Sequence, residues 1–161
     1  MYIRQGISYH IIHRLSNNLS DHFEHLLIKV KGTTAHDSII LGVLYKPPNF
    51  PPKDWIEDFQ TLNQLLIQDS CPSYLLGGDF NINLLSDSPG KHLFMEVLQT
   101  FNLTQLISEP TRYNNNSQTL LDLFICNNPS HITQSGILPH PPLADHETIY
   151  TIYKLTRPKI K

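Results

Sequence analysis

The residues best suited to chemistry lie in the segment Gly77-Gly78-Asp79-Phe80-Asn81, which follows a short apolar run at residues 73–76. That run is typical of a buried strand, and the two glycines allow the backbone to turn tightly after it. If the chain stays extended, Asp79 and Asn81 point to the same side. A carboxylate and an amide together suit phosphodiester hydrolysis, because one accepts a proton or binds a cation while the other holds a phosphate oxygen. The alternative is an ordinary turn, since Gly, Asp and Asn are common turn residues.

A second polar pair is predicted from two further segments. Asp122 lies within an apolar, strand-like run at residues 119–125, and His146 precedes a β-branched and aromatic run at residues 148–153. A carboxylate in an apolar strand needs a partner, because burying it alone is costly. His146 is an available partner, and an Asp–His pair orients the imidazole as a donor toward a phosphate. Taken singly, each residue has an ordinary structural explanation; taken together, they form a coherent site.

At this point the chain resembles a known family. The ordered motifs are Tyr45-Lys46-Pro47-Pro48, Gly78-Asp79-Phe80-Asn81, Ser108-Glu109-Pro110-Thr111-Arg112, Thr119-Leu120-Leu121-Asp122 and Asp145-His146. As a set, over residues 2–154, they resemble the endonuclease/exonuclease/phosphatase superfamily. The first and third motifs point more narrowly to the endonuclease domain of non-LTR (LINE-type) retrotransposon polyproteins.

The resemblance implies a role for each matching residue. Asp79 would orient or deprotonate the attacking water, and Asn81 would hold the scissile phosphate or that water. His146, oriented by Asp122, would stabilise charge on the phosphoryl oxygens. Most of the rate enhancement would then come from positioning and electrostatics.

The resemblance also implies a cofactor and substrate contacts. The cofactor would be Mg²⁺, with Mn²⁺ as an alternative, because hard oxygen ligands and a phosphate suit these ions. Asp145 would help to bind the cation, and Tyr45 would hydrogen-bond the phosphate. Arg112, Lys46 and Thr119 are the predicted substrate-binding residues. The substrate would be DNA, and a reverse transcriptase domain would be a partner within a parent polyprotein.

One departure from the family pattern bears on activity. In relatives, an Asn and a Glu on the first two strands contact metal and phosphate, and residues 1–44 do not supply them; Glu24 matches a different acid. The interpretation is an amino-terminally truncated domain over residues 1–154, followed by a basic tail or linker start at 155–161. A site with so few carboxylates should bind Mg²⁺ weakly, so catalysis is expected to be impaired. A smaller departure is Ala144, where relatives usually have Ser.

Composition is consistent with one domain and does not show the overall positive charge of a strongly basic nucleic-acid binder. The chain has 161 residues, 40% of them hydrophobic, a formal charge of −2 and a pI near 6.5, so it lacks the overall basic footprint of many nucleic-acid binders. Any phosphate contacts must therefore come from a local patch, for which the tail is also a candidate through Lys154, Arg157, Lys159 and Lys161. The histidine pairs His10/His13 and His22/His25 do not have convincing zinc-ligand spacing.

The two cysteines, Cys71 and Cys126, are interpreted as reduced thiols of an intracellular protein. No run is long and apolar enough to predict a membrane span. A domain that acts on genomic DNA would work in the nucleus, although no basic run resembles an import signal.

Hydrophobic periodicity predicts the elements that must position these residues. Strands are expected at residues 7–14, 23–31 and 38–45 as an antiparallel meander, and at 104–107, 120–126 and 147–155. Amphipathic helices are expected at residues 54–69 and 91–101. The mixture predicts an α/β (α+β) fold. The resemblance adds a four-layer sandwich of two mostly antiparallel sheets flanked by helices, without its first strands.

Three functions remain open from the sequence. The first is a DNA endonuclease that nicks one strand and supplies a 3′ hydroxyl for reverse transcription. The second is a non-catalytic remnant that binds nucleic acid or protein. The third is a phosphatase or lipid phosphodiesterase of the same superfamily, which the segment Glu109-Pro110-Thr111-Arg112 disfavours because a substrate-specific loop is expected there instead.

Overall fold

The computed structural model describes residues 1–12, 19–20, 23–33, 37–69, 73–114, 117–138 and 145–155. Several sequence-based predictions lie outside these ranges. They concern His13, His22, Cys71, Ala144 and the tail cations beyond residue 155.

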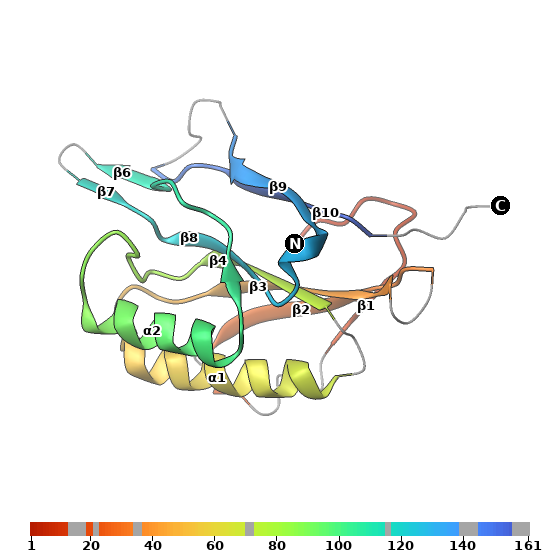
Figure 1. Ribbon diagram of the computed structural model, residues 1–161, viewed down its shortest axis with the longest axis horizontal. Helices are drawn as coiled ribbons and strands as arrows, with labels where there is room; N and C mark the ends of the chain where they lie inside the picture. Colours follow the sequence, from red (N-terminus) through yellow and green to blue (C-terminus); the bar gives the residue numbers. More distant parts are fainter. Residues whose placement is uncertain are drawn as a thin grey trace.

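A six-stranded mixed sheet forms the centre of the fold, in the order β1-β2-β3-β4-β8-β5 (Figure 1). Its strands are β1 (Tyr9–Ile11), β2 (Glu24–Val30), β3 (Ile39–Tyr45), β4 (Ser73–Asp79), β8 (Asp122–Cys126) and β5 (Thr104–Gln105). The β1-β2-β3 part is the predicted antiparallel meander. Only β3 and β4 pair in parallel within the described sheet. Their parallel pairing requires a crossover connection, which helix α1 provides.

Two helices cover one face of this sheet (Figure 1). They are α1 (Pro52–Gln68) and α2 (Pro89–Thr100). Each starts two residues earlier than predicted, because a proline suits the first helical position, where its missing N–H is not needed. Ser88 caps α2 by accepting a hydrogen bond from the Lys91 amide at 3.2 Å.

An aromatic core lies between these helices and the sheet. Trp55 and Phe59 stack at a ring-centroid distance of 5.3 Å, and Phe80 meets the Trp55 ring edge-on at 5.4 Å. Phe94 from α2 completes the group at 5.6 Å from Phe80. Because Phe80 directly follows Asp79 and is fully buried, this core anchors the segment that carries the first candidate catalytic residue.

The opposite face of the sheet is covered by a second, smaller layer. β9 (Ile132–Ile137), preceded by the 3-10 turn η3 (Pro129–His131), pairs antiparallel with β10 (Ile149–Tyr153). This pair packs over a smaller hydrophobic cluster that includes Leu75 and Cys126. Beside it, the amino-terminal residues, β2, β3 and β10 line a largely apolar cavity of about 980 Å³.

The α/β class is confirmed, and so is the mostly antiparallel character of the sheets. The described residues form three layers, namely the helices, the large sheet and the β9–β10 pair; the predicted outer helix layer beyond β9–β10 is not among them. The sequence does not predict three strands, in part because they are polar. They are the hairpin strands β6 (Arg112–Asn114) and β7 (Ser117–Thr119), and strand β9, which contains Gly136. Within the described residues, no helix is long and apolar enough to cross a membrane.

Candidate active site

The candidate catalytic side chains stand in one row across neighbouring strands. Strand register pairs Glu24 with Tyr45, Tyr45 with Asp79, and Asp79 with Asp122. Directly paired residues point to the same face of a sheet, and this is the face opposite the helices. The row lies at one end of the sheet, where β3 and β4 end and β8 begins. Residues from four strands, β2, β3, β4 and β8, therefore converge on one site.

Strand β4 continues through both glycines to Asp79, so the predicted turn at Gly77-Gly78 is wrong. The glycines allow close approach of neighbouring groups instead. A Cβ on Gly78, whose φ is +151°, would overlap the carbonyl oxygen of Leu44 on β3. A Cβ on Gly77 would overlap the ring of Phe124 on β8. Glycine at both positions therefore lets three strands pack tightly and align the row.

Asn81 lies close to Asp79, but its backbone conformation differs from the extended one predicted. Its backbone is left-handed, with φ of +44°, so the chain is not extended from residue 79 to residue 81. The Asn81 amide nitrogen donates to Asp79 Oδ1 at 3.0 Å, and its side-chain Nδ2 donates to Asp79 Oδ2 at 3.0 Å and to the Lys46 carbonyl at 2.8 Å. Asn81 therefore holds both carboxylate oxygens of Asp79 and ties them to the end of β3.

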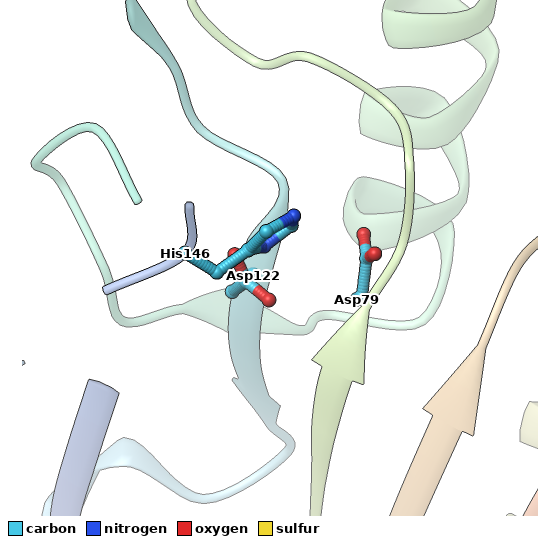
Figure 2. A group of neighbouring side chains, drawn as sticks. All are labelled: Asp79, Asp122 and His146. Atoms are coloured by element: carbon cyan, nitrogen blue, oxygen red, sulfur yellow. The ribbon is translucent and has the colours of Figure 1, made fainter. Parts of the chain in front are cut away.

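Asp122 and His146 lie together, as the sequence predicts. The imidazole Nδ1 of His146 is 2.8 Å from Asp122 Oδ2. A carboxylate can only accept, so Nδ1 carries the proton and Nε2 is left to face other groups. Figure 2 shows this pair beside Asp79, at the ends of β4 and β8.

Three side chains are close enough to share one cation. One ligand atom each from Asp79, Asp122 and His146 lie within 4.8 Å of one another. Two carboxylates fit Mg²⁺, which proteins usually hold through one or two carboxylates together with water and substrate phosphate. The residues present therefore fit a hard divalent cation, with the imidazole already engaged by Asp122.

Asp145, the predicted metal ligand, is not part of this cluster. Its Oδ2 accepts hydrogen bonds from Arg112 Nε at 2.8 Å and Nη2 at 2.7 Å. These bonds lower the pKa of the Asp145 carboxyl. Arg112, predicted to bind substrate, is therefore engaged in an ion pair with Asp145, the residue before His146. The backbones of Arg112 and His146 also form an isolated β-bridge.

Lys46 and Thr119, also predicted substrate contacts, occupy different places. The Lys46 side chain is only 1% exposed, and its ammonium donates to the Pro47 carbonyl at 3.1 Å. Burial lowers the Lys46 pKa, while the charge of Asp79 opposes that effect. Lys46 is therefore not the surface cation that the sequence predicted. Thr119 is half-buried in the β6–β7 hairpin, where its carbonyl accepts from the Thr111 amide.

The electrostatics of Asp79 favour proton acceptance. Burial raises the pKa of the Asp79 carboxyl, and the charge of Asp122 adds to the rise. The hydrogen bonds from Asn81 and the proximity of His146 work in the opposite direction. A carboxylate with a raised pKa is a better base.

Sequence reasoning assigned no role to two residues that the structure places at the site. Glu24 ends the catalytic row on β2, beside Tyr45. Thr111 is fully buried, and its hydroxyl accepts the amides of Leu121 and Asp122. The signal for Thr111 was present, since it lies in the motif Glu109-Pro110-Thr111-Arg112, but its hydrogen bonds depend on tertiary contacts.

Comparisons with known structures identify the fold. The endonuclease domain of TRAS1, a telomere-specific non-LTR retrotransposon, superposes with a TM-score of 0.75 at 17% identity. That match covers 94% of this chain and 69% of the other. Beta toxin from Staphylococcus aureus matches at 0.60 and 14% identity, covering 82% and 57%. An endonuclease/exonuclease/phosphatase family protein from Leptotrichia buccalis matches at 0.58 and 15%, covering 81% and 54%.

These structures establish an endonuclease/exonuclease/phosphatase fold, of which the chain spans about two thirds in the first case and just over half in the others. A family model described as endonuclease-reverse transcriptase matches residues 39–150. The chain therefore belongs to the endonuclease–reverse transcriptase family. Comparison with curated protein sequences found no match.

Proposed function

We propose that the chain carries the hydrolytic site of a Mg²⁺-dependent DNA endonuclease that nicks one strand. The observation that supports this most directly is the grouping of Asp79, Asp122 and His146 around one point at the end of the sheet. Family membership favours a nucleic-acid substrate over other phosphate esters. The proposed substrate implies action in the nucleus, next to a reverse transcriptase domain of the same polyprotein.

In the proposed reaction, Asp79 accepts a proton from water while the water oxygen bonds to phosphorus. The bond between phosphorus and the 3′ oxygen breaks, and the leaving oxygen takes a proton from solvent water to become a 3′ hydroxyl beside a 5′ phosphate. Asn81 fixes the Asp79 carboxylate through bonds to both of its oxygens. His146, held by Asp122, directs Nε2 toward the phosphoryl oxygens. Tyr45, 39% exposed and next to Asp79 in the row, is available to donate to the phosphate.

A bound Mg²⁺ or Mn²⁺ would neutralise charge on the phosphate, and Asp79 and Asp122 are the residues that would hold it. Binding should be weak, because Asp122 Oδ2 already accepts a hydrogen bond from His146 and both carboxylate oxygens of Asp79 accept from Asn81. We therefore expect slow turnover that depends on millimolar Mg²⁺.

A comparison of three classes of phosphate ester as substrates tests this proposal against its alternatives. The purified chain is incubated in the presence of Mg²⁺ with each of three substrates in separate reactions. The substrates are supercoiled plasmid, p-nitrophenyl phosphate and sphingomyelin vesicles. The proposal predicts nicked plasmid with 3′ hydroxyl ends and no release from the other two substrates. Preferential hydrolysis of the monoester or the lipid would replace the endonuclease with a phosphatase or a lipid phosphodiesterase. Plasmid binding without hydrolysis of any substrate would identify a non-catalytic remnant.

A further inference from the structure

Thr111 connects the two halves of the candidate site through its side chain. It is 0% exposed, and its Oγ1 accepts hydrogen bonds from the amide of Leu121 at 3.1 Å and from the amide of Asp122 at 3.0 Å. A hydroxyl oxygen has two acceptor lone pairs, so both are used to fix the start of β8. The position of the Asp122 backbone therefore depends on this one oxygen.

The backbone of Thr111 reaches the other half of the site. Its carbonyl accepts from the amide of Glu147 at 2.7 Å, immediately after His146. Its own amide donates to the Thr119 carbonyl at 2.8 Å, which closes the β6–β7 hairpin. Thr111 is therefore hydrogen-bonded to the backbone of Asp122 and to the backbone of Glu147, the residue after His146.

We propose that Thr111 is a positioning residue that sets the Asp122–His146 geometry, and that its hydroxyl oxygen is the atom responsible. This inference rests on the proposed function only for its effect on rate; the geometry it concerns is independent of activity. Without the oxygen, the amides of Leu121 and Asp122 lose their acceptor, and the start of β8 must move to find another. A misplacement of about 1 Å in such a site can cost about 100-fold in rate.

Three substitutions of Thr111 distinguish the effect of losing the hydroxyl oxygen from the effect of changing the shape of the side chain. Thr111→Val keeps the shape and removes the acceptor, Thr111→Ser keeps the acceptor, and Thr111→Cys keeps an atom of similar size that accepts only weakly. The readout is the imidazole ¹⁵N spectrum of His146 in the full chain, with Asp122→Asn as the reference for a broken pair. We expect the Nδ1-protonated tautomer in the wild type and in Thr111→Ser. We expect the His146 spectrum of Thr111→Val to resemble that of Asp122→Asn. If Thr111→Val does not fold, the His146 spectrum of Thr111→Cys takes its place in this comparison.

The nicking rate provides the second readout. We expect Thr111→Val to lower kcat about 10- to 100-fold with little change in KM, and to have no further effect in an Asp122→Asn background. Additive losses in the double variant, or a wild-type His146 spectrum in folded Thr111→Val, would overturn the inference. If the wild-type chain does not nick DNA at all, the proposed function fails, and the His146 spectrum alone decides the role of Thr111.

Discussion

Asp79 combines two properties that usually conflict, since it is a charged group that the protein buries. Burial raises the pKa of its carboxyl, which improves it as a base but penalises its ionised form in the folded state. A carboxyl whose pKa is raised by folding contributes most to stability below its unfolded pKa, and that contribution is lost as the pH rises through the folded value. At neutral pH the residue should therefore reduce stability in exchange for reactivity.

This argument predicts that Asp79→Asn stabilises the protein at neutral pH while abolishing hydrolysis. The gain in unfolding free energy over the wild type should grow from acidic to neutral pH. Asp145→Asn is the matched comparison, because Arg112 lowers the Asp145 pKa and the sign is reversed: this variant should lose a little stability at neutral pH and none in acid. Urea unfolding at a series of pH values measures both. A pH-independent difference for Asp79→Asn would contradict the burial argument.

At the scale of elements, the catalytic row depends on how closely β3 and β4 pair. Gly78→Ala places a methyl group on the carbonyl oxygen of Leu44 at a φ of +151°, so we expect a loss of about 1–3 kcal/mol and displacement of Asp79. Gly136→Ala on β9 is the control, because its Cβ would lie 3.7 Å from the Tyr150 ring, an ordinary contact. Denaturant midpoints compare the two; equal stability would show that strand spacing does not limit the site.

The sequence predicted most elements and the antiparallel β1-β2-β3 meander, but not the pairing of β3 with β4 or of β4 with β8. Residue type and periodicity were enough to place the strands and helices, and the cost of burying a lone acid was enough to join Asp122 with His146. Periodicity does not fix the register of paired strands or the neighbours of β4, so the row of Glu24, Tyr45, Asp79 and Asp122 was not predicted. The turn predicted at Gly77-Gly78 was wrong because these glycines serve the close packing of β3, β4 and β8, which a local pattern does not show.

Long side chains were the other source of error. A lysine in Tyr45-Lys46-Pro47 is usually exposed, and only the packed structure shows Lys46 buried beneath the site. The resemblance implied that Asp145 binds the cation. In the structure Asp145 pairs with the guanidinium of Arg112, whose backbone forms a β-bridge with His146. Both contacts are tertiary, and local sequence patterns do not encode them.

At the scale of the whole molecule, the two faces of the large sheet have different tasks. One face packs on α1 and α2 around an aromatic core, which stabilises the strands. The other face carries the row of Glu24, Tyr45, Asp79 and Asp122 at one end and, further along, a smaller apolar cluster. Strands β9 and β10 lie over this face (Figure 1). The face that packs on the helices therefore supports the face that carries the candidate site.

The chain as a whole carries a formal charge of −2, so attraction to DNA must come from local contacts. The two non-tail cations that the sequence suggested for this purpose are engaged elsewhere, Lys46 with the Pro47 carbonyl and Arg112 with Asp145. These two side chains are therefore already engaged and do not provide the free cations that the sequence suggested for contact with the proposed DNA substrate.

The most direct test of this account is nicking of supercoiled plasmid by the purified chain, with Mg²⁺ and with chelator, beside Asp79→Ala and His146→Ala. Lys53→Gln, an exposed change on the outer side of α1, serves as the control. The account predicts slow Mg²⁺-dependent nicking that chelator and both site variants abolish and that Lys53→Gln preserves. Nicking that persists in Asp79→Ala or in chelator, or no nicking by the folded wild-type chain, would contradict it.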